Sequence, residues 1–231
     1  MLNLDIKKLK IDTKENNLLD ISFNIKDSTA LIGESGSGKS LTLKALLNLL
    51  PNNLLVEKSF NSNFELNTNT IGFIPQNPFT SLSPMTKISK QFFCDEKRKI
   101  EALNLVDLDE TVLNKFPSQL SGGQIQRVVI AIAISKDVKI LLLDEPTTAL
   151  DIENKNNIID LINHLKNTLN ILILFVTHDI ESIKEICKNI IIIKKGKIIE
   201  TGLTKDVLSN PKEEYTNILI NSSFKNKEFR K

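Results

Sequence analysis

The sequence is poor in aromatic residues, in cysteine and in net charge, and each shortage excludes a class of function. Among 231 residues there is no tryptophan and one tyrosine, and aromatics make up 5%, so a surface that stacks nucleic-acid bases is not expected. Thirty Lys and Arg residues against 28 Asp and Glu residues leave a formal net charge of +2, which gives no field for attracting nucleic acid. The two cysteines, Cys94 and Cys187, lack the spacing of a zinc site or a disulfide framework.

Long apolar runs are also missing. The strongest runs, residues 171–176 and 190–193, are far too short to cross a bilayer, and the first eight residues lack the apolar core of a signal peptide. We therefore expect a soluble, intracellular protein that reaches a membrane only through a partner. The length suits one large domain with a substantial core.

The glycines that are present gather in one loop. Residues 33–40 fit the pattern in which two glycines four residues apart precede Lys and Ser, between a short apolar strand and a helix. We expect Gly33, Gly36 and Gly38 to adopt positive φ angles, Lys39 to contact the β- and γ-phosphates of ATP, and Ser40 to bind Mg²⁺. The residues predicted to cradle the nucleotide here are Gly33, Glu34, Ser35, Gly36, Ser37, Gly38, Lys39, Ser40 and Leu41.

Two further patterns suggest chemistry. An apolar run over 140–143 ends in Asp144, which is placed to hold Mg²⁺, and Glu145, which could orient or deprotonate water; an acidic turn before Pro146 is the alternative. Residues 120–124 resemble a helix start with Ser121 as N-cap and bare glycine amides behind it, a second anion site. The loop at residues 33–40 already surrounds one triphosphate, so the natural ligand of the site at residues 120–124 is a nucleotide held by a second copy of the protein.

The order of elements predicts an α/β fold with a mostly parallel core sheet, N-terminal antiparallel strands and a short helical subdomain over about 77–135, all within a single domain of residues 1–231. We expect residues 52–70 to form a loop with at most short strands, and residues 194–197 to turn a hairpin. Strands are predicted at 2–11, 18–25, 29–32, 71–74, 138–143, 171–176 and 190–193, and helices at 41–50, 88–93, 97–105, 124–134, 153–167 and 180–187.

Together the motifs resemble the nucleotide-binding domain of ABC transporters over nearly the whole chain. By this resemblance residues 33–40 are the Walker A loop, 120–124 the signature motif, 140–145 the Walker B strand and 149–151 the D-loop. Gln76 is similar to the Q-loop glutamine and His178 to the switch histidine, although each alone carries little weight. The resemblance implies catalytic roles for Glu145, His178 and Gln76, metal contacts from Ser40, Gln76 and Asp144, and nucleotide contacts from Ser121, Gly122, Gly123, Gln124 and Asp151.

The resemblance also implies partners. Two such domains pair head to tail around ATP, so the expected complex holds transmembrane permease subunits, a second ATPase subunit that is a sister chain or another copy, and a solute-binding protein, with no nucleic acid. The expected place is the cytoplasmic face of the cell membrane. An ABC-type ATPase acting on nucleic acid or ribosomes is the alternative, but such proteins carry coiled-coil insertions or tandem ATPase domains, and this chain has neither.

Residues 76–84, 116–119 and 144–151, with Asn210-Pro211 and Tyr215-Thr216, are similar to importers of oligopeptides, dipeptides and nickel. The sequence departs from that group in three places. It stops at Lys231, residues 52–70 and 92–117 are short, and residues 11–17 contain no aromatic to stack on adenine. The short C-terminal segment favours a metal or metal-chelate importer, such as one for nickel, over a peptide importer.

Overall fold

The computed structural model of the chain describes residues 2–148 and 151–228, and the chain divides into two compact units. The phosphate-loop unit comprises Met1–Leu66 and Leu172–Lys231, and the signature unit comprises Asn67–Ile171. Each motif predicted above falls wholly within one of these two units.

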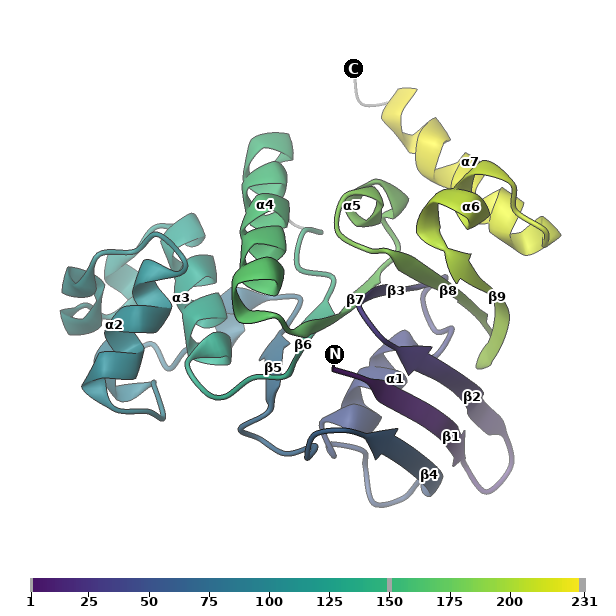
Figure 1. Cartoon of the computed structure of the whole chain (residues 1–231), viewed down its shortest axis with the longest axis horizontal. Coiled ribbons are helices and arrows are strands. Elements are labelled where there is room, and N and C mark those ends of the chain that lie inside the picture. Colours follow the sequence, from purple (N-terminus) through teal and green to yellow (C-terminus); the bar gives the residue numbers. More distant parts are fainter. Residues whose placement is uncertain (1, 149–150, 229–231) are drawn as a thin grey trace. The chain divides into compact units, whose positions relative to one another are not determined.

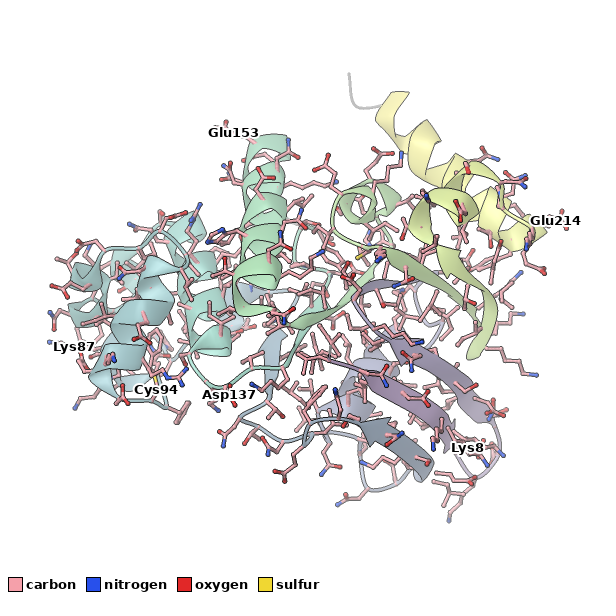
Figure 2. All side chains as sticks on the ribbon, viewed as in Figure 1. Lys8, Lys87, Cys94, Asp137, Glu153 and Glu214 are labelled. Carbon is pink, nitrogen blue, oxygen red and sulfur yellow. The ribbon has the colours of Figure 1, made fainter. Side chains whose placement is uncertain are left out.

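The phosphate-loop unit begins with a three-stranded antiparallel sheet in the order β2-β1-β4, formed by β1 (Leu4–Asp12), β2 (Asn17–Ile25) and β4 (Leu55–Ser62). Alternate apolar residues of β1 are fully buried, as expected for a strand with one face on a core. Charged residues occupy the outer face, where the Lys8 ammonium lies 2.7 Å from the Glu57 carboxylate on β4 (Figure 2).

A second group of strands in this unit carries the phosphate loop. Strand β3 (Ser28–Ile32) lies parallel to β7 (Leu172–Thr177) on one side and to β8 (Asn189–Lys194) on the other. Strand β9 (Lys197–Leu203) returns antiparallel to β8, which confirms the predicted hairpin. Every residue of β3 and β7 is buried, the pattern of parallel strands covered on both faces.

The phosphate-loop unit also contains the helices α1 (Lys39–Leu46), α5 (Ile180–Lys184), α6 (Thr204–Ser209) and α7 (Glu214–Glu228). Helices α6 and α7 lie beside one end of β8 and β9 (Figure 1). Among the described residues, no helix is both long enough and apolar enough to cross a membrane.

The signature unit combines a pair of parallel strands with a mostly helical segment. Strand β5 (Ile71–Ile74) pairs in register with β6 (Ile140–Asp144), Ile74 opposite Leu143. The helices are α2 (Glu96–Asn104), α3 (Gly122–Ile134) and α4 (Ile152–Leu169), with 3₁₀ turns at Pro78–Thr80, Ile88–Lys90, Glu110–Asn114 and Pro117–Gln119. Helix α3 packs on α2, and the Arg127 guanidinium donates 2.6 Å to the Val106 carbonyl.

The α/β class with mostly parallel core strands and N-terminal antiparallel strands is thus confirmed, but three local predictions were wrong. Residues 52–70 contain the eight-residue strand β4 instead of short strands, and residues 88–93 hold only a 3₁₀ turn instead of a helix. Helix α1 ends at Leu46, well before Pro51, because Asn48 takes a left-handed φ of 58°. There the Leu49 N–H bonds the Lys44 carbonyl and the Asn48 N–H bonds the Ala45 carbonyl, which terminates the helix.

The two cysteines belong to different units. Cys94 is half-buried in the signature unit (Figure 2). Cys187 is buried in the phosphate-loop unit, and both side chains are reduced thiols. Neither therefore forms a disulfide.

Candidate functional site

The phosphate loop leaves the end of β3, the strand between two parallel neighbours. Ile32 is opposite Thr177 of β7 and Ile192 of β8, so the loop and His178 emerge from adjacent strand ends at the same sheet edge. This edge, outside the carboxyl ends of parallel strands, is where α/β proteins bind ligands.

The glycines of the loop serve two different physical needs. Gly36 and Gly38 have φ angles of +77° and +113°, as expected for residues that must enter the left-handed region. Gly33 does not, so the predicted reason for it was wrong. A Cβ atom at Gly33 would stand 2.3 Å from the Ile193 carbonyl oxygen and 2.7 Å from the Ser37 hydroxyl. Gly33 is therefore required by close approach of the loop to β8.

Lys39 is enclosed by the loop that it follows. Its side chain is buried, and its ammonium donates hydrogen bonds of 2.7 Å to the Gly33 carbonyl and 2.9 Å to the Glu34 carbonyl. The loop is closed further by the hairpin turn between β8 and β9, since the Gly196 N–H donates 2.9 Å to the Ser37 carbonyl. A cation thus lies at the centre of a ring of main-chain groups.

Helix α1 starts with its amides turned toward this loop. Its N-cap, Gly38, supplies no side-chain hydrogen bond, and its first turn holds no acidic residue. The first amides of a helix have no partner within the helix, so this end suits an anion. The Ser40 side chain is exposed at the same turn, and Leu41 behind it is half-buried.

The turn that carries His178 is fixed on both sides. The Thr177 hydroxyl accepts from the Asp179 N–H at 3.0 Å, and Asp179 caps α5 by accepting from the Glu181 N–H at 3.0 Å and the Ser182 hydroxyl at 2.7 Å. The exposed His178 is thereby held at the edge from which the loop emerges. Thr177 and Asp179 are not among the site residues predicted from the sequence, although an Asp directly before the apolar first residue of a helix is a recognisable N-cap signal.

In the signature unit, Gln76 and the two carboxylates also share one edge. Because β5 and β6 are parallel and in register, Gln76 and Glu145 leave neighbouring strand ends, and the Gln76 amide lies 3.4 Å from the Glu145 carboxylate. The Thr148 hydroxyl donates 2.9 Å to the same oxygen. Glu145 has a left-handed φ of 47°, an uncommon backbone conformation that often marks functional sites.

A buried amide supports this turn from behind. Gln126 on α3 is 3% exposed and donates 2.9 Å to the Pro146 carbonyl. The half-buried Asp144 ends β6 directly before Glu145. The helix of the signature motif is thus bonded to the turn of the strand-end carboxylates, a link that the sequence analysis did not predict.

The signature motif forms the start of α3, with Ser121 as N-cap. The Ser121 hydroxyl accepts from the Gln124 N–H at 3.3 Å, and the Gln124 side chain accepts from the Ser121 N–H at 3.0 Å. This capping box leaves Gly122 and Gly123 exposed on the first turn, with nothing within 4 Å of a Cβ atom at Gly123. An anion can therefore approach the main chain here.

Asp151 caps α4. Its carboxylate accepts from the Asn154 N–H at 2.9 Å and from the Asn154 side-chain amide at 2.8 Å, and these hydrogen bonds hold its pKa below the usual value. Ala149 and Leu150, the rest of the predicted D-loop, lie outside the described residues.

The side-chain chemistry fits Mg²⁺. Ser40 in the phosphate-loop unit and Asp144 in the signature unit each offer a hard oxygen ligand of the kind that Mg²⁺ prefers, and this ion is commonly bound by one or two protein groups together with phosphates and water. Across residues 2–148 and 151–228, no three His, Cys, Asp or Glu side chains form a metal-binding group of their own.

The chain is similar to several known proteins. The family model described as ABC transporter matches residues 17–148. The oligopeptide transport ATP-binding protein OppD of Bacillus subtilis is 32% identical over 92% of this chain and 69% of its own length. The glutathione import ATP-binding protein GsiA of Escherichia coli is 30% identical over 94% of this chain and 41% of its own length. Among solved structures, cbiO1 of Clostridium perfringens, part of the ABC transporter complex cbiONQ, has a TM-score of 0.76 at 26% identity over 95% of this chain and 94% of that one.

Proposed function

The chain belongs to the ABC transporter family and is an ATP-hydrolysing transporter subunit, and from this premise we propose that it couples ATP hydrolysis to import across a bacterial membrane. The observation that supports the proposal is that two helix starts have main-chain amides suited to an anion, the phosphate loop before α1 and the capped start of α3. A phosphate loop is by itself sufficient to surround one triphosphate. The second is explained by a nucleotide held on another ATPase subunit, with the two subunits paired head to tail.

In the proposed reaction, the loop amides and Lys39 hold the triphosphate while Glu145 orients or deprotonates the attacking water. Mg²⁺, held by Ser40 and Asp144, would neutralise charge on the phosphates. Ser121 of one subunit would stabilise the γ-phosphate on the other, and His178 would contact the same group. Gln76 would link ATP binding and hydrolysis to the contact with the permease, because its side-chain amide is hydrogen-bonded to the Glu145 carboxylate.

Exposed apolar side chains in the signature unit favour a protein partner. Phe79, Met85 and Phe93 are 58%, 86% and 79% exposed. Phe79 lies beside the signature motif, since a Cβ atom at Gly122 would be 3.3 Å from its ring. We assign Phe79 to a contact with a permease segment, because phenylalanine is enriched at protein–protein interfaces. The protein would then work at the cytoplasmic face of the membrane.

Short peptides or peptide-like compounds are the proposed cargo. Relatives named for oligopeptide and glutathione transport match most of this chain, which favours peptides over a metal chelate. A metal chelate is the second candidate cargo, and the specificity of the solute-binding protein would determine which of the two is transported. Isolating the tagged protein from native membranes tests the assignment: a permease pair, a second ATPase and a solute-binding protein should accompany it. Ribosomes or DNA-repair proteins without a permease would refute it.

Two substitutions test the chemistry. Glu145→Gln should still bind ATP but hydrolyse it about 100-fold more slowly, because the general base is lost. Glu153→Gln, which changes an exposed glutamate of α4, is the matched control and should hydrolyse ATP normally. Near-normal turnover by Glu145→Gln would remove Glu145 from this role.

Lys39→Ala should abolish nucleotide binding, because it removes the enclosed ammonium of the loop. Lys44→Ala, at an exposed position of the same helix, should bind ATP like the wild type. Calorimetric titration with ATP and Mg²⁺ measures both, and equal affinities would contradict the loop assignment.

A further inference from the structure

The phosphate loop has a hydrogen bond from the far end of the chain. The Glu34 N–H donates to the Tyr215 hydroxyl at 3.3 Å, across 181 residues of sequence. Tyr215 lies in the first turn of α7, and both residues belong to the phosphate-loop unit. The proposed chemistry assigns no role to this contact.

The peptide groups of Glu34 are held at both ends. Its N–H is bound by Tyr215, and its carbonyl accepts from the Lys39 ammonium at 2.9 Å. A rotation of the main chain at Glu34 would therefore move the Glu34 carbonyl, which accepts a hydrogen bond from Lys39. Lys39 is the residue expected to contact the phosphates. Small misplacements of binding groups are costly in preorganised sites.

Tyr215 is itself firmly placed. The side chain is 7% exposed, and the Lys194 ammonium lies 4.3 Å from the centre of its ring, within cation–π range. Burial raises the pKa of Tyr215 above its usual value, so the hydroxyl stays neutral over the physiological range. A neutral hydroxyl accepts the Glu34 N–H and places no charge beside the loop.

The start of α7 is anchored by a buried carboxylate. Glu200 on β9 accepts from the Lys212 N–H at 2.9 Å and the Glu213 N–H at 3.3 Å, directly before α7. Burial acts to raise the pKa of Glu200, but the Thr216 side chain and these two amides outweigh it and hold the pKa below its usual value. The ionised Glu200 thus fixes the turn of α7 that carries Tyr215.

We infer that Tyr215 is a positioning residue for the nucleotide: its hydroxyl fixes the Glu34 peptide and thereby increases the affinity of the phosphate loop for the nucleotide. The inference rests on the proposed function, since it requires that the loop binds a nucleotide. Helix α7, which belongs to none of the motifs, thereby contributes to nucleotide binding.

The test compares Tyr215→Phe with the wild type by titration with ADP and Mg²⁺, which measures the loop without hydrolysis. Loss of one hydrogen bond should raise the Kd about 2- to 10-fold, with kcat for ATP close to the wild-type value. Ile220→Ala is the control: it truncates another buried side chain of α7 but leaves the hydroxyl. It should lower the melting temperature without weakening ADP binding.

Amide exchange gives a second, direct readout. The Glu34 amide should exchange faster in Tyr215→Phe and at the wild-type rate in Ile220→Ala. Equal Kd values for wild type and Tyr215→Phe, or equal weakening in both variants, would overturn the inference. Failure of the wild-type chain to bind ADP would refute the proposed function instead, whereas binding that is insensitive to the hydroxyl would refute only the role of Tyr215.

Discussion

Replacing Gly33 by alanine should damage both the stability and the nucleotide binding of the protein, because the loop touches β8 at this residue. The added Cβ atom would lie 2.3 Å from the Ile193 carbonyl oxygen and 3.0 Å from the Ile193 side chain. The nearest obstacle is main chain, and Ile193 belongs to a strand paired with both β3 and β9. No side-chain rotation relieves such a contact.

The size of the effect follows from the geometry. Normal van der Waals separation requires the loop and the strand to move roughly 1 Å apart. Overpacking of this kind costs about 1–3 kcal/mol, and we expect the upper end because backbone must shift. For a chain of this size 3 kcal/mol corresponds to a fall of about 6–12 °C in the melting temperature. Displacement of the Gly33 carbonyl, which accepts from Lys39, should weaken ATP binding at least ~10-fold.

Thermal unfolding and ATP titration of Gly33→Ala, Gly36→Ala and Gly123→Ala distinguish two effects of an added methyl group. One is a steric clash with neighbouring atoms, and the other is strain from a positive φ angle. Gly36→Ala adds a methyl group in open space but at a φ of +77°, so it should cost about 1 kcal/mol from strain alone. Gly123→Ala adds one in open space within a helix and should be neutral or stabilising by up to about 1 kcal/mol. If Gly33→Ala melted within about 2 °C of the wild type and bound ATP normally, the explanation from close approach would be refuted.

Two further predictions concern groups that support the site. Gln126→Leu should lower the free energy of unfolding by about 1–3 kcal/mol in denaturant titrations, because the buried Pro146 carbonyl loses its donor; no change would mean that the bond contributes nothing. Glu200 has a lowered pKa, so its stabilising contribution should be complete above the unfolded pKa of about 4.3 and lost as the pH falls through the folded pKa. Glu200→Gln should flatten this acid dependence, and an unchanged profile would exclude Glu200 as its source.

The sequence predicted best those features that depend on local pattern. Strands β6 and β7 are apolar runs that end in a single polar residue, and β3 is apolar over residues 30–32. The phosphate loop has a glycine spacing that is specific to this kind of loop. The N-cap role of Ser121 was also predicted, since the side chains that form a capping box are three residues apart.

The predictions failed where partners distant in sequence decide the structure. Strand β4 is mostly exposed and has no alternating apolar pattern, so its pairing with β1 cannot be recognised from its own residues. The reason for Gly33 is an oxygen of Ile193, and the neighbour of Glu34 is Tyr215; neither lies near the loop in sequence. The predicted helix extends beyond the end of α1 because the sequence pattern does not show that Asn48 takes a left-handed backbone conformation, which ends the helix.

Several residues that contact the phosphate loop are synthesised long after the loop itself, so the loop cannot complete its contacts early in translation. The loop is synthesised early, but the residues against which it closes, Ile193, Gly196 and Tyr215, leave the ribosome much later. At about 5–20 residues per second, the 181 residues between Glu34 and Tyr215 take roughly 10 to 35 s to translate. A chain interrupted before Tyr215 therefore lacks these contacts, and we expect it to bind ATP more weakly than a chain that includes Tyr215.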